Sequence, residues 1–127
     1  MAQSVQLFHI RLEPAPGPHE PGANAAYDFV APLDTRGMID VDAWRRDRAL
    51  CFVHRIESSD NVQHGLLVHR PGGPNGATWR FDYELGEGDE ETGFRFEAHA
   101  FTVGAYVSVR DADDQIRTYR VASVTPA

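Results

Sequence analysis

The chain has 127 residues and a formal charge of -7, a length that fits one domain with a hydrophobic core of its own. All twelve basic residues are arginine, which excludes lysine-based chemistry such as a Schiff base or the phosphate-binding lysine of a P-loop. The acidic balance also argues against nucleic acid as a partner, because that affinity rests on basic residues. We therefore treat residues 1–127 as a single domain.

The first quarter of the chain predicts two strands separated by a loop. The first strand is predicted at residues 4–12 and ends in the proline-rich segment 13–18, which neither a helix nor a β-ladder accommodates. The second strand is predicted at residues 27–31. One short helix follows, with Asp40 as its N-cap and with Trp44 as the side chain that anchors it on the sheet.

From residue 50 onward, apolar and polar residues alternate with the period of a β-strand. The alternation is clearest at residues 78–85, where all eight positions fit. The other strands are predicted at residues 50–57, 61–70, 94–100, 105–110 and 116–124. The pattern predicts a mainly β fold, a small antiparallel β-barrel of seven to eight strands with one short helix; a two-sheet sandwich is the alternative.

The parity of the alternation also predicts how the strands pair, because a slip of one residue moves every side chain to the other face. If Trp79 and Tyr83 face the core, His54 lies opposite His64, and both His64 and Phe96 lie opposite Tyr83. The rows on either side are apolar: Leu50/Val68/Trp79/Ala100, Phe52/Leu66/Phe81/Ala98 and Ile56/Val62/Leu85/Phe94. A polar row is thereby predicted between apolar rows on an inner face.

This row of His54, His64, Tyr83 and Phe96, with Trp79 nearby, is the candidate ligand-binding site. The alternative is a core network in which the polar groups satisfy one another, since buried polar groups need partners. A metal site would need three or four ligands, and the inferred inner face holds no cysteine or carboxylate. No metal ion and no other cofactor is therefore predicted.

Other motifs carry less chemistry. The loop after residue 70 is a candidate anion site, with Arg70 and Arg80 supplying charge and Gly72 and Gly73 supplying N–H groups; the alternative is an ordinary long hairpin loop. The single cysteine, Cys51, allows no internal disulfide and is predicted to be a buried apolar residue. No catalytic residue is assigned, because the motifs of hydrolases and redox enzymes are missing.

Three segments carry a resemblance to known sequences: residues 8–13 (FHIRLE), 27–34 (YDFVAPLD) and 104–111 (GAYVSVRD). In these segments the chain resembles a group of small uncharacterised bacterial proteins of similar length. The resemblance implies a bacterial cytosolic protein and supplies neither an activity nor functional residues.

The chain carries no pattern of a signal peptide or of a membrane span, which requires about 18 consecutive apolar residues. We expect a soluble, cytoplasmic protein with no membrane partner.

Three functions follow from these patterns. The first is a non-catalytic module that binds a small molecule or a partner through the inward His/His/Tyr row. The second is a small enzyme in which His54 or His64 is the general base and Tyr83 the proton donor. The third is a structural protein that forms a homodimer through an exposed sheet edge.

Overall fold

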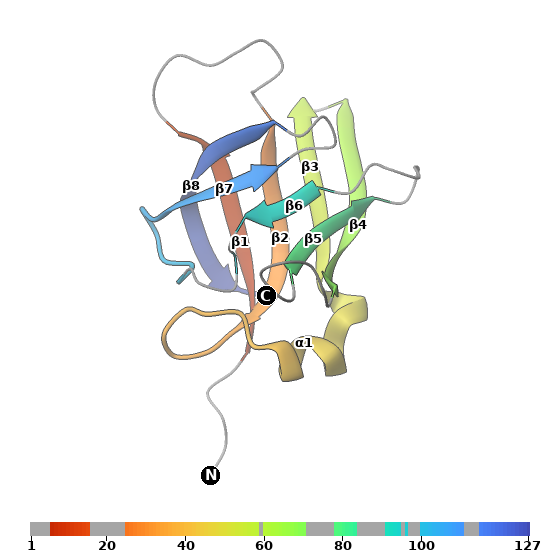
Figure 1. Ribbon diagram of the computed structural model, residues 1–127, viewed down its shortest axis with the longest axis vertical. Coiled ribbons are helices and arrows are strands. Elements are labelled where there is room, and N and C mark those ends of the chain that lie inside the picture. The colour runs from red at the N-terminus through yellow and green to blue at the C-terminus, as the bar shows by residue number, and fades with distance from the viewer. Residues whose placement is uncertain are drawn as a thin grey trace.

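The computed structural model describes residues 6–15, 25–58, 60–70, 78–83, 91–94, 96, 100–110 and 115–127. Within these ranges eight antiparallel strands follow one another in chain order around a closed barrel (Figure 1). The strands are β1 (Gln6–Pro14), β2 (Ala26–Leu33), β3 (Phe52–Ser58), β4 (Asn61–Arg70), β5 (Thr78–Tyr83), β6 (Glu91–Phe94), β7 (Tyr106–Arg110) and β8 (Ile116–Pro126). Because β8 pairs with β1, the barrel prediction is confirmed over the sandwich.

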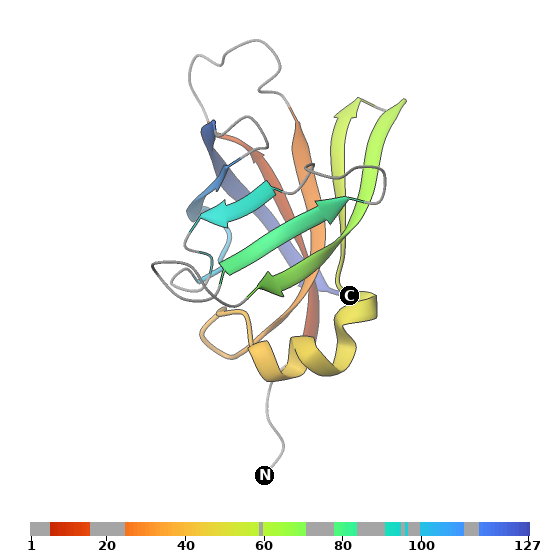
Figure 2. The same ribbon diagram turned by 45° about the vertical axis from the view of Figure 1, so that its right-hand side comes forward.

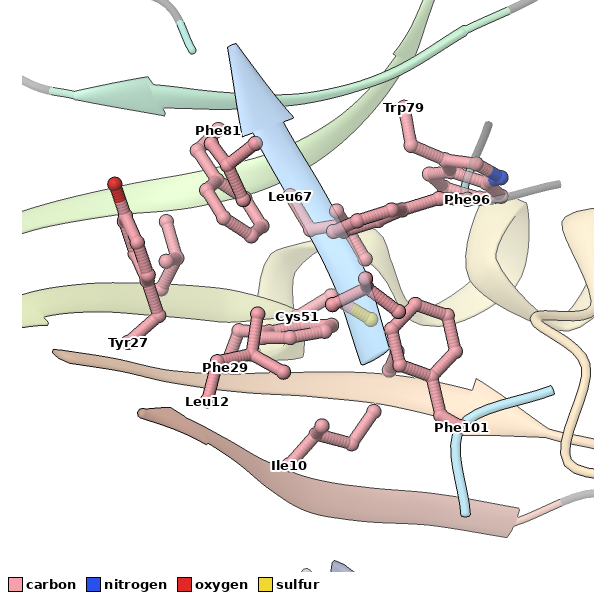
Figure 3. Close-up of a cluster of buried hydrophobic side chains, with 14 of the residues drawn as sticks. Ile10, Leu12, Tyr27, Phe29, Cys51, Leu67, Trp79, Phe81, Phe96 and Phe101 are labelled. Atoms are coloured by element: carbon pink, nitrogen blue, oxygen red, sulfur yellow. The ribbon is translucent and has the colours of Figure 1, made fainter. Parts of the chain in front are cut away.

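The interior of the barrel is a packed core in which aromatic rings contact one another (Figure 3). Phe29 and Phe81 lie with ring centroids 5.2 Å apart, and Phe96 and Phe101 meet edge to face at 5.0 Å. The inward side chains of the C-terminal hairpin complete the core: Val107, Val109, Tyr119 and Val121. Aromatic pairs such as Phe29–Phe81 add to the stability that burial of the rings provides. The described interior is thus occupied by side chains of the protein itself.

A short helix lies across one end of the barrel (Figures 1 and 2). Helix α1 (Val41–Asp47) continues into a 3-10 turn at Arg48–Leu50. The carboxylate of Asp40 accepts a hydrogen bond of 2.8 Å from the backbone N–H of Ala43, so the predicted N-cap is confirmed. Trp44 is buried, and its indole N–H donates a hydrogen bond of 2.9 Å to the carbonyl oxygen of Leu67. The helix is therefore anchored on the barrel as its sequence predicts.

The pairing of β3 with β4 agrees with the predicted register, but that of β4 with β5 differs by one residue. His54 lies opposite His64, as expected. On the next ladder Leu67, not Leu66, lies opposite Phe81, and Gly65, not His64, lies opposite Tyr83. Of the two neighbouring leucines, Leu67 is fully buried and Leu66 is 43% exposed. The predicted inner face of β3 and β4 is therefore the outer face.

Gly65 allows β4 and β5 to approach each other closely at this point. A Cβ atom added at Gly65 would collide with the backbone of Asp82 and Tyr83, so a larger residue would push the strands apart. The glycine occupies an inward position in line with Leu67 and shows which face of β4 turns inward.

The sixth strand also differs from its prediction. It runs over Glu91–Phe94 rather than residues 94–100, and it places Gly93 opposite Trp79. Phe96 follows this strand and is fully buried, but it does not pair with Tyr83. The predicted strand began too late because residues 91–93 were assigned to the preceding loop.

Candidate functional site

The predicted row of His54, His64, Tyr83 and Phe96 is divided between the two faces of the barrel wall. The rings of His54 and His64 lie side by side, with centroids 4.6 Å apart, on the outer face. Tyr83 and Phe96 belong to the core, as does Trp79. The prediction of an inward row is wrong, and so is an enzyme that pairs either histidine with Tyr83, because the sheet separates them. The cause is the one-residue difference between β4 and β5.

The two histidines belong instead to a polar row that crosses the outer face of four strands. Asp28 on β2 lies opposite His54 on β3, which lies opposite His64 on β4. On β1, His9 places its Nδ1 atom 3.3 Å from a carboxylate oxygen of Asp28. The ring of Phe52 stands between those of His9 and His54, at 5.8 Å and 5.0 Å. We call His9, Asp28, His54 and His64 the histidine row.

The surroundings of His54 favour its neutral form. Partial burial lowers the pKa of His54, and the neighbouring His64 and His9 lower it further, whereas Asp28 acts in the opposite direction. At neutral pH this imidazole is therefore uncharged and keeps a free nitrogen lone pair for a proton, a hydrogen bond or a metal ion.

An open groove of about 500 Å³ lies beside the histidine row, on the outer face of β8, β1 and β2. Its lining is polar and consists of His9, Arg11, Glu13, Asp28, Ser123 and Thr125. The strand period of two brings the three β1 residues to one face.

A bulge supplies the hydroxyl groups on the far side of the groove. Leu12 pairs with Val121, whereas Arg11 pairs with Ser123, so β8 has one extra residue at this point. Val121 points into the core, and the extra residue turns Ser123 outward. Re-aiming a side chain is what a β-bulge does at many functional sites.

The charges in the groove are arranged in two pairs. The Nε atom of Arg11 lies 3.6 Å from a carboxylate oxygen of Glu13, and His9 faces Asp28. The same Arg11 Nε is buried and has no hydrogen-bond partner. The lining holds two carboxylates, Glu13 and Asp28, and one guanidinium, Arg11, so these three groups together carry a formal charge of -1. Such a groove accepts hydrogen bonds from the amine or hydroxyl groups of a ligand.

The groove could not be predicted from the sequence, because no single motif indicates it. His9 was given no role, and Asp28, Ser123 and Thr125 stand far apart in the chain. The available signal was the run of polar residues at every second position of β1, which marks one face of a strand. The contribution of β8 depends on the bulge, which alternation does not reveal.

Two other predictions concern the anion site after residue 70 and the single cysteine. Of the predicted anion site, the structure describes Arg80, which lies on β5 opposite Val68. The described residues do not include Gly72, Gly73 or the side chain of Arg70. The anion site therefore stays a prediction. Cys51 is buried as predicted, and burial raises the pKa of its thiol to about 11, so the thiol stays protonated.

Two further features are missing from the described ranges. They hold no set of three or more His, Cys, Asp or Glu side chains placed to bind a metal ion. Nor does any helix in them combine the length and apolarity that crossing a bilayer demands.

No family model, curated protein or solved structure matches this chain. A function must therefore be inferred from the residues on the outer face of the barrel.

Proposed function

We propose that the protein is a non-catalytic module that binds a small polar molecule in the groove on β8, β1 and β2. The observation that carries this proposal is the open volume of about 500 Å³ with its charged and hydroxyl lining. Small-molecule sites commonly have volumes of about 300–1,000 Å³ and a few convergent polar groups. The packed aromatic core supports a site on the outside of the barrel rather than within it.

The lining favours a ligand that is neutral or carries one positive charge. Arg11 already faces Glu13, which leaves Asp28 as the acceptor that an ammonium group would meet. Ser123 and Thr125 can both donate to and accept from hydroxyl groups. A polyhydroxylated amine, such as an amino sugar, meets both requirements. Following the resemblance to bacterial proteins, we place this binding in the bacterial cytoplasm.

The experiment uses three probes that share one ring and differ in charge: glucosamine, glucose and glucuronate. Each is titrated into the isotope-labelled protein while backbone amide resonances are followed by NMR. We expect glucosamine to shift the amides of β1, β2 and the end of β8, glucose to shift them less, and glucuronate to leave them in place.

Asp28→Asn tests the assigned acceptor, because it removes the charge and keeps the size. It should weaken glucosamine binding about tenfold or more, the effect of losing one charge-assisted hydrogen bond. The matched control is Asp60→Asn, which removes an exposed carboxylate in the β3–β4 turn, away from the groove lining. Tightest binding of glucuronate, or no shift with any probe, would contradict the proposal.

A further inference from the structure

The outer face of β3 and β4 is unusually apolar for a sheet surface. Its outward residues are Phe52, His54, Ile56, Val62, His64 and Leu66, which we call the outer strip. None of its four apolar members packs against the core cluster, and Leu66 is 43% exposed. A solvated sheet face normally carries polar residues, whereas strands that are apolar on both faces are typically covered on both.

The geometry points to a zinc site that two copies of this chain build together, each contributing His54 and His64. A structural zinc ion takes four ligands in a tetrahedron, and imidazole nitrogen is one of its preferred donors. In the described ranges a single chain offers no set of three or more metal-binding side chains. The two histidines are therefore half of a site, which a second copy completes with the same pair.

The pair already has nearly the spacing that zinc requires. The histidines lie directly opposite each other on adjacent strands, and their ring centroids are 4.6 Å apart. Two imidazoles on one tetrahedral zinc have ring centres about 5 Å apart, given Zn–N bonds of about 2.1 Å. The rings meet edge to face, with their planes at 84°, so side-chain rotation would have to aim both lone pairs at one ion.

The surroundings of the pair also suit a metal ion. Asp28, the neighbour of His54 on β2, supplies a negative charge beside the ion. The apolar residues of the outer strip form the kind of shell that limits access of water to a metal centre.

The size of the face indicates why a metal would be needed. The ten residues of β4 extend for about 33 Å and strands lie about 4.8 Å apart, so β2 to β4 present about 500 Å². Stable interfaces bury about 800 Å² per partner, so the area of this face is too small for a stable dimer held by apolar contacts alone. Two copies also repel each other, because each carries a formal charge of -7. A zinc ion between neutral histidines adds positive charge where the copies meet.

The proposed zinc ligands, His54 and His64, do not line the ligand groove, so the two proposals fail separately, although Asp28 lies beside both sites. The test measures the mass of the full chain by light scattering, first in EDTA and then with added zinc. We expect a monomer in EDTA and a dimer with zinc, and calorimetry should give one zinc ion per two chains. With Co²⁺ in place of zinc, the visible absorption of a tetrahedral site should appear.

Three variants decide which side chains hold the ion. His54→Ala and His64→Ala should each abolish the zinc-dependent dimer, while His9→Ala, the matched control in the same row, should retain it. Circular dichroism checks that each variant is folded. The proposal is overturned if zinc leaves the wild type monomeric, if the dimer persists in EDTA, or if His9→Ala is as damaging as the other two.

Discussion

The two faces of the β3–β4 hairpin both carry apolar residues but have opposite environments. On the inner face, Val53 and Leu67 are fully buried beneath the aromatic core. On the outer face, Phe52 is half-buried and lies opposite the exposed Leu66, and His54 and His64 form the next outward pair. An apolar side chain therefore contributes more to the stability of this barrel on the inner face of the hairpin than on the outer face. The outer apolar residues remain available for another role.

The largest expected effect is a loss of stability, and it should differ between two phenylalanines on opposite faces of the barrel wall. Phe81→Ala removes a fully buried ring that packs on Tyr27, Phe29 and Phe96, and should lower the free energy of unfolding by about 3–5 kcal/mol. Phe52→Ala should cost about 1 kcal/mol, because its ring is only half-buried and contacts His9 and His54 on the outer face. Urea unfolding followed by tryptophan fluorescence measures both. Equal losses would show that the faces do not differ as described.

A smaller effect is expected where β4 and β5 approach each other. Gly65→Ala should lower the free energy of unfolding by about 1–3 kcal/mol, because the new methyl group meets the backbone of Asp82 and Tyr83. The same unfolding measurement applies. The control is Leu66→Ala, one residue further along β4 on the outer face. A Gly65→Ala variant as stable as the wild type would contradict the close approach of the strands.

The smallest effect is the pH dependence that His54 confers. The folded protein lowers the pKa of His54, so protonation favours the unfolded chain as the pH falls below about 6.5, the ordinary histidine pKa. The stabilisation by the neutral form is thus present above that pH and is lost as the pH falls through the lowered pKa. His9, Asp28 and His64 are the titratable neighbours on the adjacent strands.

The measurement compares unfolding of the wild type and His54→Gln in EDTA at a series of pH values. We expect the wild type to lose stability more steeply than the variant below pH about 6.5. Parallel curves would mean that His54 titrates alike in the folded and unfolded chain.

Much of the fold could be predicted because it depends on local signals. Asp40 caps the helix through its own side chain, and β4 occupies residues 61–70 as predicted. The β3–β4 register was also predictable, because a short turn leaves little choice of pairing. The connection from Arg70 to Thr78 is longer, and a longer loop accommodates a shift of one residue at little cost.

The candidate site was less predictable because it depends on which face is inside. The inward positions of β3 and β4 include Arg55 and Gln63 and are less apolar than the outward ones. Alternation therefore gave the correct neighbours, His54 and His64, on the wrong side of the wall. The predicted row that pairs Val68 with Trp79 turns the next residue, His69, outward, whereas the ring of His69 lies against that of Trp79, with centroids 4.4 Å apart. The groove depends further on the bulge that turns Ser123 outward, a feature of pairing rather than of composition.

The most direct test of the account is the pair Leu66→Ala and Leu67→Ala, two identical substitutions at adjacent positions of β4. Unfolding by urea in EDTA, where the single chain is measured, gives the two losses of stability. We predict that Leu67→Ala lowers the free energy of unfolding by about 2–5 kcal/mol and Leu66→Ala by less than about 1 kcal/mol. The reverse order would place Leu66 and the two histidines inside the barrel and contradict the account.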